Sequence, residues 1–108
     1  GAFCLLHASL VEGWGMPVTE AMASGCPVVT SVTSSLPEVT GGHAVLVDPE
    51  STTSIEHGLR RLALSESLQN ELSAAGPKWT ARFSWDNQAA KIATVYRELI
   101  ALFEYHQA

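Results

Sequence analysis

The sequence is short of positive charge and of long apolar runs. Its 6 Lys and Arg stand against 11 Asp and Glu, which gives a formal net charge of -5. This balance leaves no broad cationic surface for nucleic acid or anionic lipid, so we expect neither as a partner. No stretch approaches the roughly 18 to 20 consecutive apolar residues that a membrane-spanning helix requires. The chain therefore looks like a soluble protein.

Cysteine is also scarce. The two cysteines, Cys4 and Cys26, can form at most one disulfide. Cys4 lies in an apolar run and Cys26 lies beside a proline, surroundings typical of free buried thiols, so we expect both to be reduced. Cys4 and His7 have loose metal-ligand spacing, with His43 as a conceivable third ligand, but there is no second matching pair. We predict no metal site.

The N-terminus lacks an initiator methionine and any charged segment followed by an apolar one. We therefore expect a fragment of a cytoplasmic protein, with any peripheral membrane contact made by parts outside this chain. The 108 residues are 46% hydrophobic, which is ordinary for a globular protein. One small core is the most that this length allows.

Three short apolar runs have the length of buried strands, and they span 3–6, 27–31 and 44–47. The spacing predicts a helix over about 17–24, a single helical turn at 36–39, and a helix that begins near a capping box at Thr53 to Glu56. Uniformly apolar strands that alternate with helices are typical of parallel βαβ units. The predicted fold class is α/β, a Rossmann-like parallel sheet with helices over both faces.

The C-terminal third is predicted to be helical. Gly76 and Pro77 should interrupt or end one helix, because proline lacks the N–H that helix continuation needs. Ser84 is a suitable N-cap for a long final helix over about 84–106. Apolar residues recur there at spacings of three and four, so this helix should bury an apolar stripe.

The stretch from Glu12 to Gly25 is where we expect the chemistry. It joins the first strand to a helix through a glycine loop, and Pro17 suits the first turn of that helix. Gly25 is placed to cap the other end of the helix. Unpaired amides and the positive end of the helix dipole would then face outward near Gly15. These features predict a site for an anion such as a phosphate.

The order of the motifs resembles glycosyltransferase family 4, whose members are nucleotide-sugar-dependent retaining enzymes of the GT-B fold. The resemblance covers nearly the whole chain, and it is carried by Glu12 and Glu20 with seven residues between them, Gly15-Met16-Pro17, Glu20 to Ala23, Gly25 to Val29, Leu36 to Val39 and Phe83 to Trp85. It implies that residues 1–108 are the second half of the C-terminal, donor-binding domain. Ala8, Trp14 and Thr19 depart from the usual pattern without removing a proposed ligand.

The resemblance also implies roles for individual residues. Glu20 would bind the ribose hydroxyls, and Glu12 would bind hydroxyls of the transferred sugar and count as the catalytic candidate, since a carboxylate accepts hydrogen bonds from a diol. The diphosphate would lie beside the loop and the helix start. The donor-binding set is therefore Glu12, Gly13, Gly15, Met16, Pro17, Val18 and Glu20, and His7, Ser34, Ser35 and Glu38 are candidates for lining the pocket.

The expected donor is a UDP- or GDP-hexose, with no further cofactor. The acceptor, a sugar or lipid-linked sugar, would be held by an N-terminal domain outside this chain, as would a basic pair that neutralises the diphosphate. We therefore expect the isolated chain to be inactive, and its exposed sheet edge to be open to association.

Three other interpretations remain open. Without the surrounding motifs, Glu12 and Glu20 would be a solvated loop carboxylate and a first-turn helix acid. They could also form a glycosidase acid and nucleophile pair, although the sequence gives no strand-end context for that geometry. Finally, the chain could be a non-catalytic Rossmann-like nucleotide-binding or protein-interaction module.

Overall fold

The computed structural model describes residues 1–107. Strands and helices alternate through the first half of the chain, and helices alone make up the second half. In chain order the elements are β1 (Leu5–His7), α1 (Met16–Ala23), β2 (Val28–Ser31), α2 (Leu36–Thr40), β3 (Val45–Val47), α3 (Thr52–Ala63), α4 (Glu66–Thr80), the 3-10 turn η1 (Ala81–Phe83) and α5 (Trp85–Gln107).

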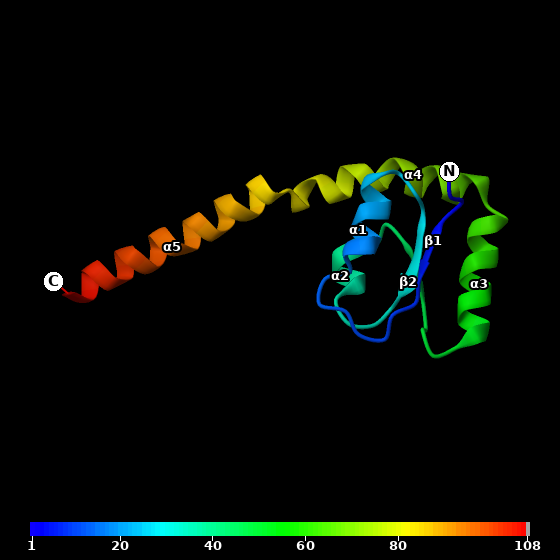
Figure 1. Cartoon of the computed structure of the whole chain (residues 1–108), viewed down its shortest axis with the longest axis horizontal. Coiled ribbons are helices and arrows are strands. Elements are labelled where there is room, and N and C mark those ends of the chain that lie inside the picture. Colours follow the sequence, from blue (N-terminus) through cyan, green and yellow to red (C-terminus); the bar gives the residue numbers. More distant parts are fainter. Residues whose placement is uncertain (108) are drawn as a thin grey trace.

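The three strands form one parallel sheet in the order β1-β2-β3. In register, Leu5 lies opposite Val28, and Val29 lies opposite Val45. The strands therefore end at the same edge of the sheet, and the connections that follow β1 and β2 both leave from that edge (Figure 1). The predicted strands and their parallel arrangement are confirmed.

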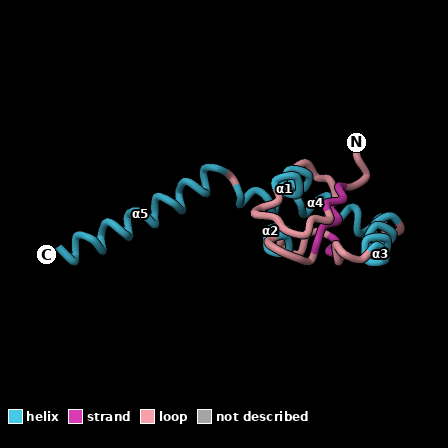
Figure 2. The backbone as a smooth tube through the Cα atoms, turned by 60° about the horizontal axis from the view of Figure 1, so that its bottom comes forward, coloured by secondary structure: helices cyan, strands magenta, loops and turns pink. Residues whose placement is uncertain are grey.

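Helices cover both faces of the sheet, as the uniformly apolar strands predict (Figure 2). On one face α1 and α2 pack through a cluster of Val18, Met22, Val28 and Leu36. On the other face α3 packs through a second cluster of Val29, Val45, Val47 and Leu62, which Leu72 of α4 joins, and α4 continues beyond this cluster to contact α1. The sheet is thus a thin central layer with a separate apolar cluster on each side.

Two expectations about helix boundaries are wrong. The N-cap of α3 is Ser51, whose hydroxyl accepts a hydrogen bond from the Ser54 amide at 3.1 Å, so the capping box at Thr53 does not form. Moreover, α4 continues through Pro77 as far as Thr80. Gly76 explains why a helix is kept there, because it is buried against the backbone of Met22 and lets α4 lie close to α1.

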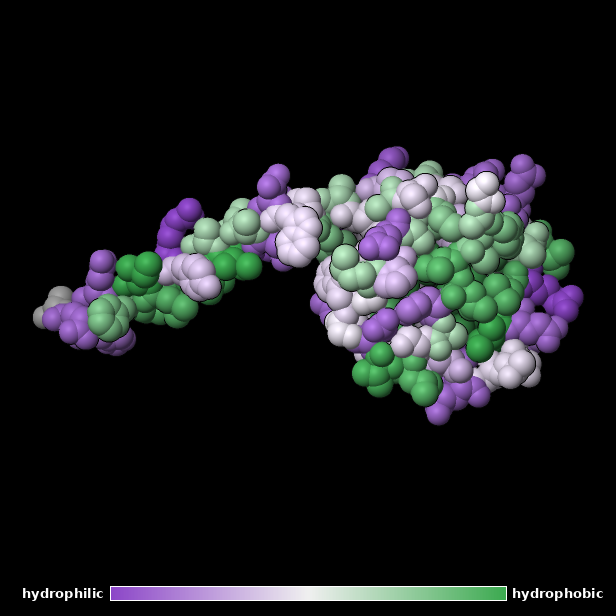
Figure 3. Space-filling model, viewed as in Figure 1, coloured by the Kyte–Doolittle hydropathy of each residue, from purple (hydrophilic) through white to green (hydrophobic). Residues whose placement is uncertain are grey.

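The final helix occurs almost where the sequence predicts it. Ser84 caps it, accepting a hydrogen bond from the Asn87 amide at 3.1 Å. The expectation that it buries an apolar stripe is wrong for this chain, because no residue of α5 is buried. The helix points away from the sheet, and its large apolar side chains are exposed (Figures 1 and 3). These are Trp85, Ile92, Val95, Tyr96, Leu99, Ile100, Leu102, Phe103 and Tyr105.

The structure also bears on the two cysteines and on the predicted lack of a membrane-spanning helix. Cys4 and Cys26 are both free thiols, in line with the sequence-based interpretation. Burial raises the pKa of the Cys4 thiol, and the nearby Cys26 adds to the rise. None of the helices within residues 1–107 combines the length and apolar character needed to cross a bilayer.

Candidate functional site

The loop between β1 and α1 lies at the edge where the parallel strands end. Gly15 closes this loop as the N-cap of α1, with φ 86° and ψ 55°. Its carbonyl accepts hydrogen bonds from the amides of Val18 at 3.0 Å and Thr19 at 3.3 Å. In the first turn of α1, the amides of Val18 and Thr19 are therefore bonded within the helix, and Pro17 has no N–H to offer. The helix start faces the sheet edge at which ligands of open α/β folds bind.

Glu12 is held in that loop by its carboxylate. His7 is the last residue of β1, and its Nε2 lies 2.8 Å from Oε1 of Glu12. The two side chains are 23% and 29% exposed, respectively, so they are shielded from solvent without being buried. The structure thus brings together two of the sequence-predicted residues, one from the strand end and one from the loop.

The backbone of Glu12 is held by the segment that follows β2. Ser34 Oγ accepts a hydrogen bond from the Glu12 amide at 3.1 Å and donates one to the Glu12 carbonyl at 2.8 Å. Ser35 Oγ donates to the same carbonyl at 3.0 Å. Ser34 and Ser35 were predicted to approach the ligand pocket, and here their hydroxyls contact the loop that carries Glu12.

Three more hydroxyls continue this pattern, and the sequence analysis missed them. Thr30 Oγ1 donates to the His7 carbonyl at 2.7 Å, and Ser31 Oγ donates to the Ser9 carbonyl at 2.6 Å. Thr33 Oγ1 donates more weakly to the Leu10 carbonyl at 3.4 Å. We call the hydroxyls of residues 30, 31, 33, 34 and 35 the hydroxyl ladder. The available signal was five Ser or Thr residues among the six from 30 to 35.

The other sequence-predicted residues are more dispersed. Glu20 is exposed on α1, one turn beyond the helix start, and Glu38 is exposed in the first turn of α2. The side chain of Val18 is fully buried in the core. Because its amide donates to Gly15, Val18 supports the fold of the loop rather than offering an amide to a ligand. Gly13 is exposed in the loop next to Glu12.

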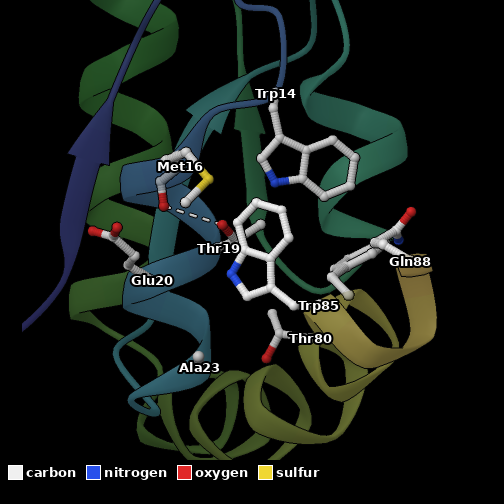
Figure 4. A pocket seen from close by; sticks show the side chains of 9 residues that line it. Trp14, Met16, Thr19, Glu20, Ala23, Thr80, Trp85 and Gln88 are labelled. Atoms are coloured by element: carbon white, nitrogen blue, oxygen red, sulfur yellow. Dashed lines mark hydrogen bonds between the residues drawn. The ribbon is translucent and has the colours of Figure 1, made fainter.

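An apolar cavity of about 410 Å³ lies beside this loop, between α1 and the start of α5. Two tryptophans, Trp14 and Trp85, line it together with Met16 and Phe83 (Figure 4). Trp14 packs edge-on against Phe83 with the ring centroids 4.9 Å apart. In Figure 4 the carboxylate of Glu20 points away from the two tryptophan rings. Met16 and Glu20, two of the predicted donor-binding residues, line the cavity, whereas His7 and Glu12 do not.

The arrangement offers no cluster of metal ligands in the part of the chain that the structure describes. No group of three His, Cys, Asp or Glu side chains within residues 1–107 is placed to hold an ion. What the loop does offer is a carboxylate held at the carboxyl end of β1, in the same loop that leads into the start of α1. Carboxylates accept hydrogen bonds from hydroxyls, and helix starts attract anions, so the site suits a ligand that carries both groups.

Comparison with known proteins identifies the family. Residues 1–79 match the family described as "Glycosyl transferases group 1". The chain belongs to this family. The matched region contains the whole sheet, the Glu12 loop, the hydroxyl ladder and most of α4.

Relatives of known structure or name agree with this assignment. The chain is 33% identical over 94 residues to "O-antigen chain mannosyltransferase B" of Escherichia coli, covering 87% of this chain and 25% of that protein. It is 39% identical over 97 residues to "MMP alpha-(1->4)-mannosyltransferase" of Mycolicibacterium hassiacum, covering 86% and 24%. Among solved structures it resembles sucrose-phosphate synthase from Thermosynechococcus elongatus, with a TM-score of 0.74 and 27% identity over 87% of this chain and 24% of that one.

These comparisons confirm the expected family and the α/β fold of a GT-B glycosyltransferase. The chain spans about a quarter of the length of each of these two mannosyltransferases.

Proposed function

We propose that this chain is the donor-binding part of a retaining glycosyltransferase that transfers a hexose from a nucleotide-diphosphate sugar to an acceptor. In this proposal residues 1–108 are part of the C-terminal domain, and the acceptor, a sugar or a lipid-linked sugar, is held by parts of the enzyme outside the chain. The observation that carries the proposal is the placement of Glu12 in the loop between β1 and α1, where its carboxylate contacts His7 at the carboxyl end of β1.

In this proposal, different residues bind the diphosphate, the transferred sugar and the ribose of the donor. The helix start at Gly15 and Met16 faces the diphosphate, where negative charge builds up as the nucleotide leaves. Fixed dipoles aimed at that charge lower the barrier without having to reorganise. Glu12 then binds hydroxyls of the transferred sugar, and Glu20, further along α1, binds the ribose.

The proposed sugar is a hexose carried on UDP or GDP. The family supports a nucleotide-sugar donor. Two of the relatives are named mannosyltransferases, and this supports a hexose. The chain has few cations of its own, with 6 Lys and Arg in all, so the diphosphate needs basic residues from another part of the protein.

Replacement of each glutamate in the whole protein tests the division of labour. Glu20→Ala should weaken binding of free UDP or GDP by about 10- to 100-fold, because a hydrogen bond to a charged group contributes about 1.5–3 kcal/mol. Glu12→Ala should leave the free nucleotide unaffected and weaken UDP-glucose or GDP-mannose by a similar factor. Calorimetric titration of both ligands against both variants measures this. Wild-type affinity and turnover in both variants would contradict the roles proposed for Glu12 and Glu20.

A non-catalytic interaction module is the alternative function. The exposed apolar residues of α5 favour it, because large exposed apolar surfaces commonly mark protein contacts. The same titrations separate the two functions, since an interaction module without a donor site would bind neither nucleotide nor nucleotide sugar.

A further inference from the structure

We propose that His7 is a positioning residue for Glu12, and that the hydroxyl ladder works with it to present a single carboxylate oxygen to the sugar. This inference rests on the proposed function, because it assumes that Glu12 binds the transferred sugar. It adds a residue whose contribution is made through Glu12 and not by contact with the nucleotide.

The main chain of His7 is fixed by β2. His7 is the last residue of β1 and pairs in register with Thr30 of β2. The buried hydroxyl of Thr30 also donates to the His7 carbonyl at 2.7 Å. The backbone of His7 is thus anchored on the sheet, and the Nε2–H of its ring donates to Oε1 of Glu12 at 2.8 Å. Because a carboxylate only accepts, this bond requires a hydrogen on Nε2.

The backbone of Glu12 is fixed from the opposite side by Ser34. This serine has φ 58° and is the only non-glycine residue with positive φ among residues 1–107. Residues other than glycine rarely adopt this left-handed backbone conformation. Here it lets one hydroxyl accept from the Glu12 amide and donate to the Glu12 carbonyl. The unfavourable backbone conformation of Ser34 therefore occurs where its side chain binds Glu12.

These contacts leave one part of Glu12 free. Among the described residues, the contact to the Glu12 carboxylate is made at Oε1, by His7. A carboxylate has about four acceptor positions, so Oε2 keeps its capacity to accept hydrogen bonds from sugar hydroxyls. A carboxylate with one oxygen occupied and its backbone held has little freedom to turn. Such preorganisation is what sugar orientation at the reacting carbon requires.

Two substitutions of His7 separate hydrogen bonding from packing. His7→Phe keeps a ring of similar size and removes the donor, whereas His7→Gln removes the ring and keeps an N–H donor near the position of Nε2. In the whole protein, His7→Phe should weaken UDP-glucose or GDP-mannose, whichever the wild type binds, by about tenfold. His7→Gln should stay within about threefold of wild type. Free UDP or GDP should bind all variants equally.

Ser34→Gly provides a second test, because glycine accepts φ 58° and the substitution removes the side chain that makes both bonds to Glu12. It should reproduce the selective loss of nucleotide-sugar affinity. If His7→Phe also loses the free nucleotide through misfolding, His7→Gln and Ser34→Gly decide: a wild-type nucleotide-sugar affinity in Ser34→Gly, or a tenfold loss in His7→Gln, overturns the inference. A wild-type nucleotide-sugar affinity in a well-folded His7→Phe overturns it as well.

Measurements on Glu12→Ala distinguish a failure of the proposed function from a failure of the positioning role of His7. If the wild type binds no nucleotide sugar, or Glu12→Ala binds it normally, the proposed function fails. If the wild type and Glu12→Ala behave as expected and the His7 and Ser34 variants match the wild type, only the positioning role fails.

Discussion

At Gly15, backbone conformation and packing both require the absence of a side chain. The residue has φ 86°, and a Cβ atom there would lie 2.8 Å from Cδ2 of the buried Leu36. Leu36 begins α2, so this contact joins the glycine loop to the segment after β2. Gly15 therefore sets both the direction in which α1 starts and the distance between the loop and α2.

Gly15→Ala should accordingly destabilise the chain by about 2–4 kcal/mol, which combines about 1–2 kcal/mol for a left-handed alanine with a similar cost for overpacking. Gly13→Ala is the matched control in the same loop, since no atom lies within 4 Å of its would-be Cβ and its φ is not positive. That variant should stay within about 0.5 kcal/mol of wild type, as is usual for surface positions. Urea unfolding followed by circular dichroism measures both, and equal stabilities for the two variants would contradict the explanation.

Sequence reasoning selected Gly15 from local signals, the glycine loop and Pro17, and it selected Glu12 and the serines at 34 and 35 because of the family resemblance. It did not find the bond between His7 and Glu12 or the hydroxyl ladder. The ladder joins two segments that the parallel register of β1 and β2 brings side by side, whereas the bond between His7 and Glu12 depends on how the loop turns back onto the end of β1. Hydroxyls after a strand are common in loops, so their partners could not be read from the chain.

In α4, one residue shows how packing overrides the local preferences of a helix. Gly76 is buried where α4 crosses α1, and a Cβ there would lie 2.6 Å from the Met22 carbonyl oxygen. Pro77 follows it inside the helix. The Gly-Pro pair reads as a helix end from sequence, yet the contact with α1 maintains the helix to Thr80. Thr80 Oγ1 donates to the Gly76 carbonyl at 3.0 Å in the last turn of the helix.

Gly76→Ala should therefore destabilise the protein even though alanine is the better helix former by about 1 kcal/mol. The expected net loss is about 1–3 kcal/mol, because the clash is with backbone that cannot rotate away. Asn70→Ala, at an exposed position of the same helix, shows the propensity effect alone and should be neutral or slightly stabilising. Thermal unfolding compares the two. A stabilised Gly76→Ala variant would mean that α4 does not approach α1 this closely.

Helix caps were predicted with mixed success for a related reason. Ser84 was identified correctly because it precedes a long amphipathic pattern. At α3 the sequence offers Ser51, Thr52, Thr53 and Ser54 in succession, and each can cap a helix. Ser51 is selected by its place after the turn at Asp48, where the Ser54 hydroxyl also accepts a hydrogen bond from the Asp48 amide at 2.9 Å. Which of four neighbouring hydroxyls caps the helix depends on where β3 ends.

At the scale of the whole molecule, α5 determines the shape. The chain extends over 64 × 28 × 18 Å, with a radius of gyration of 18.0 Å. A compact domain of this length would have a radius of about 13 Å. The difference arises because α5 projects from the body (Figure 1). Its periodicity correctly predicts a helix with an apolar face, but periodicity cannot say what covers that face.

Two leucine substitutions in the 108-residue chain test this division between body and projecting helix. Leu62 on α3 is completely buried, whereas Leu99 on α5 is 56% exposed. Leu62→Ala should cost about 2–5 kcal/mol, the range for a buried leucine that leaves a cavity. Leu99→Ala should cost less than about 1 kcal/mol, because the side chain already contacts solvent and alanine favours the helix.

Equilibrium unfolding in urea, repeated at two protein concentrations, gives both values and exposes any self-association through α5. At low concentration a loss for Leu99→Ala comparable to that for Leu62→Ala would show that α5 folds back onto the body. A loss for Leu99→Ala that grows with protein concentration would instead show that the apolar face of α5 meets another copy, since only an association makes stability depend on concentration. A small and constant loss would establish that the folded core of this chain ends before Trp85.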